Sequence, residues 1–213
     1  KIRPSFYYAA TGAIYLDPEG LWLTQAERAT IDTTPDERTN FGRDLQFRAI
    51  WRYVQGNDYA YDFYPASFQG SRTVEDIRLF MGRLLVHELS HAGDFSPVAD
   101  LAAQPRDKTV LQAINDQSDR WVSTRLRAAL PQQSGAWPSL AQVLYAGQRA
   151  SYQERRYTPA QAGSLVEPDR ASDAYGYFSQ FEDLAMISEE LLSRCLFDMQ
   201  RDFATSNRPS DGQ

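Results

Sequence analysis

Hydrophobic and polar side chains alternate over residues 47–54, and this period of two predicts a β-strand. A Gln-Gly-Asn-Asp turn then leads into the aromatic run 59–63, which is typical of a hairpin. The apolar runs 13–16 and 21–24 flank an Asp-Pro-Glu-Gly tetrapeptide, which favours a second hairpin with a type I turn. The first third of the chain is therefore predicted to be rich in β-structure.

From Thr73 the hydrophobic period changes to that of a helix. Apolar residues recur every three or four positions from Ile77 up to His91, and Thr73 with Asp76 resembles an N-terminal capping box. Gly93 and the proline after it predict the end of this helix.

Three further helices are predicted, over 108–130, 138–147 and about 179–203. We expect a loop over 155–178, which holds several prolines and glycines, and a loose tail over 205–213. The chain shows no internal repeat and no linker-like segment. The pattern predicts a single domain over 1–213 of the α+β class, with a β-rich N-terminal part and a helical C-terminal part.

Composition excludes several classes of protein. The chain has 213 residues, of which 42% are hydrophobic, and a net charge of −6, which argues against a disordered chain and against a sequence-independent nucleic-acid binder. No apolar run approaches the ~20 residues of a transmembrane helix.

The single cysteine, Cys195, is expected to be a packed thiol. A start at Lys1 rather than Met is compatible with export after signal removal and equally with a trimmed start, so the location is left open, with a periplasmic or secreted one favoured. The oligomeric state is not predicted.

Histidine is scarce in this chain, and its placement is informative. The two histidines, His87 and His91, stand four residues apart within the predicted helix, so both imidazoles lie on one face and can bind one metal ion. Glu88 follows the first histidine and is placed to act as a general base beside a catalytic zinc ion. This His-Glu-x-x-His segment predicts a site for one catalytic Zn²⁺.

A catalytic zinc ion usually has three protein ligands, and here the third must be a carboxylate or a tyrosine because no histidine remains. Glu182 on the last predicted helix is the leading candidate, followed by Asp94 and Asp173. Another interpretation is that Glu182 forms a capping box with Ser179. Three acids are candidates to orient a ligating histidine, namely Asp94, Asp183 and Glu189, with the last two favoured.

The two motifs together resemble a known family. His87-Glu88-x-x-His91-x-x-Asp94, followed by Glu182-x-x-Ala185-x-x-Ser188-Glu189, is similar to the gluzincin zinc metallopeptidases, in particular the lethal-factor-like and Mlc-titration-factor-like groups. The resemblance implies a zincin-like fold with His87, His91 and Glu182 as zinc ligands and Glu88 as the base. It also implies a tyrosine that stabilises the oxyanion, for which Tyr175 is the matching position and Tyr177 a competitor.

The expected function is therefore hydrolysis of peptide bonds in a peptide or protein substrate, with an edge strand of the β-rich part binding the extended chain. Two alternatives remain: a zinc-binding interaction or effector module with little or no proteolytic activity, and a zinc hydrolase acting on another substrate. The scattered arginines Arg72, Arg78 and Arg83 are expected to form ordinary ion pairs at the surface.

Overall fold

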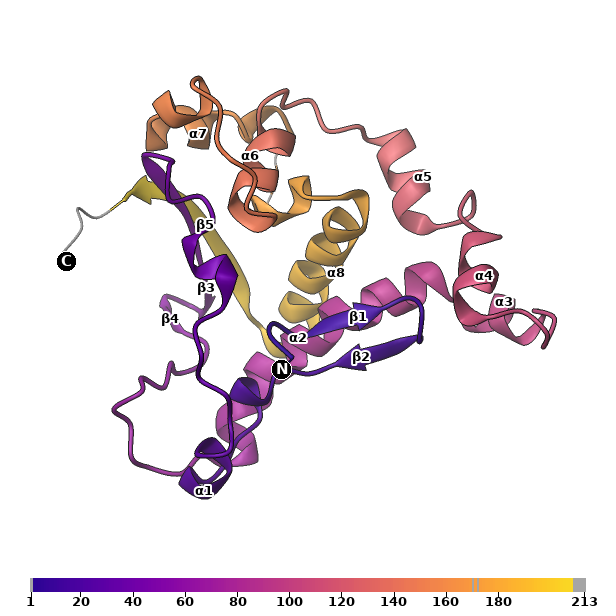
Figure 1. The fold of residues 1–213 in the computed structure, drawn as a ribbon, viewed down its shortest axis with the longest axis horizontal. Coiled ribbons are helices and arrows are strands. Elements are labelled where there is room, and N and C mark those ends of the chain that lie inside the picture. Colours follow the sequence, from indigo (N-terminus) through magenta and orange to yellow (C-terminus); the bar gives the residue numbers. More distant parts are fainter. Residues whose placement is uncertain (1, 170, 172, 209–213) are drawn as a thin grey trace.

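The computed structural model describes residues 2–169, 171 and 173–208, and it shows a mixed α and β fold with two small antiparallel sheets (Figure 1). The end of the predicted loose tail, 209–213, lies outside these residues. Among the helices that are described, none is long and apolar enough to cross a membrane.

The larger sheet has the strand order β4-β3-β5. The predicted hairpin is confirmed as β3 (Phe47–Gln55) and β4 (Asp58–Tyr59), although the second strand has only two residues. The third strand, β5 (Gln200–Asn207), pairs with residues 47–54 of β3.

The predictions of a helix through Phe203 and of a loose segment from Thr205 are therefore wrong. The last helix, α8 (Gln180–Phe197), stops where Asp198 adopts a left-handed conformation, with φ 51°. Pairing with β3 then converts the following residues into a strand whose more buried side chains alternate with exposed ones.

The smaller sheet consists of β1 (Phe6–Tyr8) and β2 (Ala13–Tyr15). The predicted pairing of 13–16 with 21–24 is wrong because β2 pairs with the preceding strand instead. The Asp-Pro-Glu-Gly segment forms one 3₁₀ turn capped by Asp17, and Thr24 caps the short helix α1 (Gln25–Arg28). The predicted turn at 17–20 is confirmed, but the predicted partner of the strand at 13–15 is not.

The longest helix, α2 (Val74–Phe95), matches the prediction and begins with the Thr73–Asp76 capping box. It packs against α8 on one side and against β1 on another, so the β1–β2 hairpin lies along it (Figure 1). Buried residues of α2 include charged and polar side chains, which a helix tolerates only where partners satisfy them.

The remaining helices differ in part from the prediction. A continuous helix over 108–130 is wrong: α4 (Val110–Asn115) and α5 (Val122–Ala129) are separated by a turn. The helix predicted at 138–147 is confirmed as α6 (Trp137–Tyr145). Short helices also form at α3 (Val98–Ala102) and α7 (Pro159–Ser164), and the latter lies in the segment predicted as loop.

The main hydrophobic core joins α6 to the larger sheet. Trp137 is fully buried against Phe47 and Tyr177, and its indole nitrogen donates a hydrogen bond to the Ala162 carbonyl. The expectation of a packed thiol is wrong, because Cys195 is exposed on α8.

Candidate metal centre

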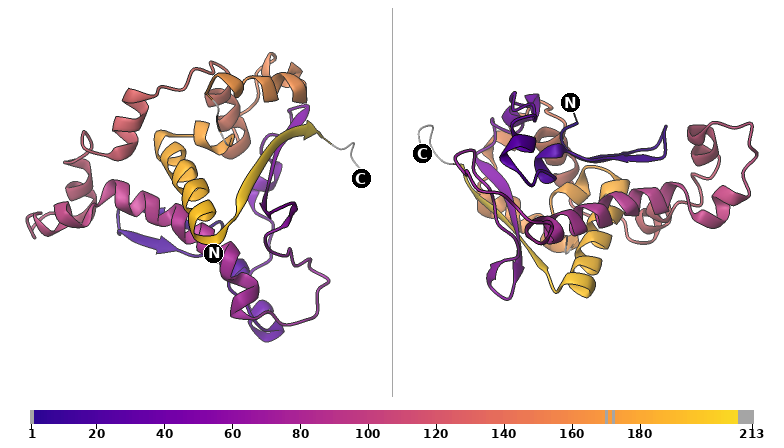
Figure 2. Two further views of the ribbon diagram at one scale, coloured as in Figure 1. Left: turned by 180° about the vertical axis from the view of Figure 1, so that it is seen from behind. Right: turned by 90° about the horizontal axis from the view of Figure 1, so that it is seen from below.

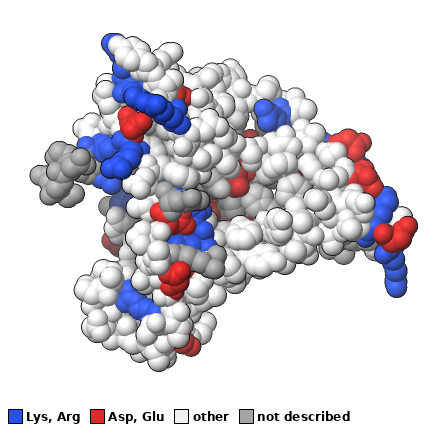
Figure 3. Space-filling view, in the orientation of Figure 1, with Lys and Arg blue, Asp and Glu red and all other residues white. Residues whose placement is uncertain are grey.

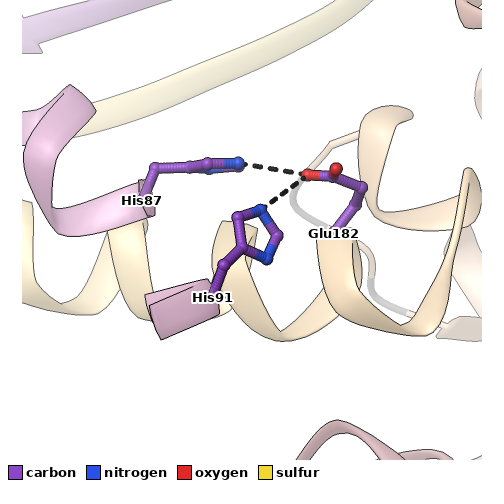
Figure 4. A group of neighbouring side chains, drawn as sticks. All are labelled: His87, His91 and Glu182. Atoms are coloured by element: carbon purple, nitrogen blue, oxygen red, sulfur yellow. Dashed lines mark hydrogen bonds and ion pairs between the residues drawn. The ribbon is translucent and has the colours of Figure 1, made fainter. Parts of the chain in front are cut away.

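Two helices bring three ligand-type side chains together. His87 and His91 project from α2, and Glu182 projects towards them from the first turn of α8 (Figure 4). Glu182 Oε2 lies 3.1 Å from His87 Nε2 and 3.5 Å from His91 Nε2. Within the described residues, this group has three potential ligand atoms that all lie within 4.8 Å of one another.

These separations are compatible with zinc coordination. Ligand atoms placed ~2.0–2.1 Å from a tetrahedral zinc ion lie about 3.3 Å from one another. The two distances from Glu182 bracket that value, and the donor set of two imidazoles and one carboxylate suits Zn²⁺. The residue types and these two separations are those of a group that could hold a metal ion such as Zn²⁺.

Only one of the two hydrogen bonds of a capping box forms between Ser179 and Glu182. Ser179 does cap α8, because its hydroxyl accepts a hydrogen bond from the Glu182 amide. The Glu182 carboxylate, however, turns towards the histidines. Burial alone raises the pKa of Glu182, but its interactions with His87 and His91 outweigh burial and lower it to about 2. This carboxylate is therefore ionised at neutral pH, as a metal ligand must be.

The intervening Glu88 is buried beside the histidines, on the side of the β1–β2 hairpin. Its Oε2 accepts a 2.7 Å hydrogen bond from the Tyr7 backbone amide in β1. Burial raises the pKa of Glu88, against the lowering effects of His87, His91 and the Tyr7 amide. A raised pKa brings a carboxylate closer to the range in which it exchanges protons at neutral pH.

Behind His87 lies a buried cluster of charges. His87 Nδ1 is 2.9 Å from Glu189 Oε2, while Glu189 Oε1 accepts hydrogen bonds from Arg83 (3.3 Å) and Arg201 (3.4 Å). Arg201 also pairs with Asp173. Burial raises the pKa of Glu189, and Arg201 opposes that rise. A carboxylate on Nδ1 holds the ring so that Nε2 faces Glu182, which is the usual role of a residue behind a ligating histidine.

The two candidate tyrosines have different surroundings. The Tyr175 ring stacks on His87 with centroids 6.3 Å apart, and its hydroxyl feels the charge of the Glu182 carboxylate. Burial and the Glu182 carboxylate raise the pKa of Tyr175, so its hydroxyl keeps its proton. Tyr177 instead donates to Asp169 at 2.7 Å and stacks on Trp137 in the core. Of the two, Tyr175 is the one that faces the cluster.

The other candidate acids lie elsewhere. Asp94, near the end of α2, accepts a 3.0 Å hydrogen bond at Oδ1 from the Ser123 backbone amide, and so caps the first turn of α5. Asp173 is ion-paired with Arg201, and Asp183 is a half-buried residue in the first turn of α8. Of the three acids considered behind the histidines, the structure brings Glu189 to His87.

Aromatic rings cover the side of the site next to His91. Phe95 stacks on His91 (6.3 Å between centroids) and on Tyr7 (5.9 Å), and it also contacts Trp121 and Phe181. The face seen in Figure 1 is hollowed between the β1–β2 hairpin and α6, with acidic atoms visible inside the hollow (Figure 3). Aromatic walls and burial reduce the water around the polar cluster, which strengthens its electrostatic interactions.

Sequence reasoning missed the contributions of Tyr7, Arg83 and Arg201. Arg83 stands four residues before His87, and therefore on the same helix face, which was a usable signal. The surface interpretation is wrong for Arg83 and Arg72, which are buried, while Arg78 forms the expected exposed pair with Glu75. Nothing local distinguishes Tyr7, because its role depends on a contact across 81 residues.

Comparisons with known proteins add no relative. No family model matches the chain, and neither the curated proteins nor the solved structures contain a significant match. The case for a function therefore rests on the geometry and chemistry of the site.

Two arginines of the larger sheet, the buried Arg201 in β5 and the exposed Arg52 in β3, provide a matched test. Arg201→Met leaves Asp173 and Glu189 buried without this guanidinium, so we expect it to lower the free energy of unfolding by about 3–5 kcal/mol. Arg52→Met removes the exposed Arg52–Asp202 pair and should cost less than about 1 kcal/mol. Urea unfolding measures both, and equal losses would contradict a special role for the buried cluster.

Proposed function

We propose that this protein is a zinc-dependent peptidase with a zincin-like fold. The observation that carries the proposal is the convergence of His87, His91 and Glu182 from two packed helices, with Glu88 buried beside them. A purely structural zinc site usually has four protein ligands and no use for a neighbouring carboxylate base. Three ligands together with a base are the usual composition of a catalytic site.

Each residue has a defined task in this proposal. A bound Zn²⁺ would polarise the substrate carbonyl and acidify the attacking water. Glu88 takes a proton from that water and later returns it to the leaving amine, so no net proton is consumed. The Tyr175 hydroxyl, which is protonated and faces the cluster, donates a hydrogen bond to the oxygen on which negative charge develops. Glu189 keeps the His87 ring in its orientation.

The position of the β1–β2 hairpin favours an extended peptide as the substrate. β1 pairs with β2 along one edge, while the Tyr7 amide on its other edge points to Glu88. An extended peptide added at that edge would run directly past the base. The outer face of the hairpin carries the stacked rings of Phe6 and Tyr15 and shows no charged residue in Figure 3.

One observation favours a second candidate, a zinc-binding interaction module with little or no proteolytic activity. One carboxylate oxygen of Glu88 already accepts a hydrogen bond from the Tyr7 backbone amide. A hydrogen bond to the charged form of a carboxylate makes it a weaker base. Activity measurements separate the two candidates, because both retain zinc.

Metal analysis tests the ligand set. We expect the wild-type chain to bind one Zn²⁺ and Glu182→Ala to bind it more than about 100-fold more weakly, since loss of an outer partner alone typically costs 10–100-fold. Asp94→Asn, which alters the cap of α5, serves as the comparison and should retain zinc. Unchanged affinity in Glu182→Ala, measured by competition with a chromogenic chelator, would remove Glu182 from the site.

Replacement of the base separates binding from chemistry. Glu88→Gln keeps the size of the side chain but cannot accept the proton, so hydrolysis of a quenched fluorescent peptide library should fall by about 10²–10⁴-fold. Zinc content should stay at the wild-type level. If the zinc-loaded wild type cleaves no peptide in the library, the interaction module becomes the better description.

The two tyrosines form a natural pair of variants. Tyr175→Phe removes the hydroxyl that faces Glu182, and we expect kcat to fall by about 10²–10³-fold with zinc affinity retained. Tyr177→Phe removes a hydrogen bond to Asp169 in the core and should affect the free energy of unfolding more than kcat. The reverse pattern of rates would exchange the roles of the two residues.

A further inference from the structure

A second concave feature lies on another face of α8 from the one that carries Glu182 and Glu189. It is a cavity of about 990 Å³ bounded by α8, the C-terminal half of α5 with the connection that follows it, described residues between 168 and 176, and the start of β5. In the left view of Figure 2, α8 lies between the α5–α6 connection and β5. We call this cavity the α5–α8 groove.

The floor of the α5–α8 groove is apolar and accessible. It contains Met186, Ile187 and Leu191 of α8 together with Leu126 and Leu130 from the α5 side. Leu130, Leu191 and Ile187 are 69%, 60% and 45% exposed. Contiguous exposed apolar side chains rimmed by polar ones mark interaction sites more often than single exposed residues do.

The groove has the length of a short helix. The α8 residues that line it recur every three or four positions from Asp183 to Arg194, and so form one helix face about 16 Å long. A partner helix of about three turns would match that length and would place apolar side chains at the same spacing.

The charge around the groove is negative and incompletely balanced. Asp169, Asp183 and Glu190 line it, and within the described residues none of the three forms an ion pair with Lys or Arg. The two lining arginines are already engaged, because Arg194 pairs with Asp198 and Arg201 with Asp173. Burial and the nearby Asp169 raise the pKa of Asp183 despite the lowering effect of Arg127, so a further cation would stabilise its charged form.

We propose that the α5–α8 groove binds a basic amphipathic helix of a partner protein. The apolar face of that helix would pack on Ile187, Leu191 and Leu130, and its Lys or Arg side chains would pair with the three carboxylates. Charge favours a basic partner over a second copy of this chain, which carries a net charge of −6. The proposed contacts do not use the candidate zinc ligands, because His87, His91 and Glu182 are not among the residues that line the groove.

Fluorescence anisotropy with designed peptides tests this surface. The probe is a labelled 14-residue peptide, about four turns long, with Leu at helical spacing and Lys elsewhere, and its counterpart carries Glu in place of Lys. We expect the wild-type protein to bind the Lys peptide at least tenfold more tightly than the Glu peptide. Leu191→Ser and Glu190→Lys should each weaken binding of the Lys peptide by at least tenfold.

Matched controls lie outside the groove. Leu111→Ser changes a leucine of α4 that is 43% exposed, and Asp119→Lys makes the same change of charge at another exposed acid. Both should bind like the wild type, and circular dichroism melts check that all four variants are folded. No binding to the wild type, or equal binding by all four variants, would overturn the proposal. A monomer–dimer equilibrium that Leu191→Ser abolishes in sedimentation would assign the groove to a second copy instead, and would also overturn it.

Discussion

The contact between the Glu189 carboxylate and its three cationic or polar neighbours is the constraint on which the structure depends. It joins α2 through Arg83 and His87 and β5 through Arg201 to the middle of α8. A carboxylate that is 1% exposed is costly unless its oxygens are satisfied, so these elements can pack only in the arrangement that supplies the donors. The aromatic rings of Trp51 and Tyr53 in β3 cover both guanidinium groups and link the sheet to the same point.

This arrangement fixes the orientation of the His87 ring. With one ring nitrogen of His87 held by Glu189, the other faces Glu182 without any rearrangement of α2. Glu182 lies seven residues before Glu189, two turns along the same helix, so one packing contact sets the position of both carboxylates. Ligands carried by two rigid helices hold their geometry better than ligands on loops do. A neighbouring face of α8 lines the α5–α8 groove, so one helix contributes to both features.

Local patterns predicted the elements whose stability is local, and they failed where a distant partner decides. The α2 capping box, the β3–β4 turn and α6 could all be predicted from spacing and turn residues. β5 could not, because its strand conformation depends on β3, about 150 residues earlier. In the site, the His-Glu-x-x-His spacing and the second motif indicated His87, His91 and Glu182. The roles of Arg201 and Tyr7 arise only when β5 and β1 meet the two helices, and no local signal marks them.

The central claim is that one zinc ion binds between α2 and the first turn of α8. Diffraction from zinc-loaded crystals, collected above and below the zinc absorption edge, locates the metal directly. We expect a single anomalous peak about 2.0–2.2 Å from His87 Nε2, His91 Nε2 and a carboxylate oxygen of Glu182. A peak at other residues, or zinc-loaded crystals with no peak between these three side chains, would contradict it.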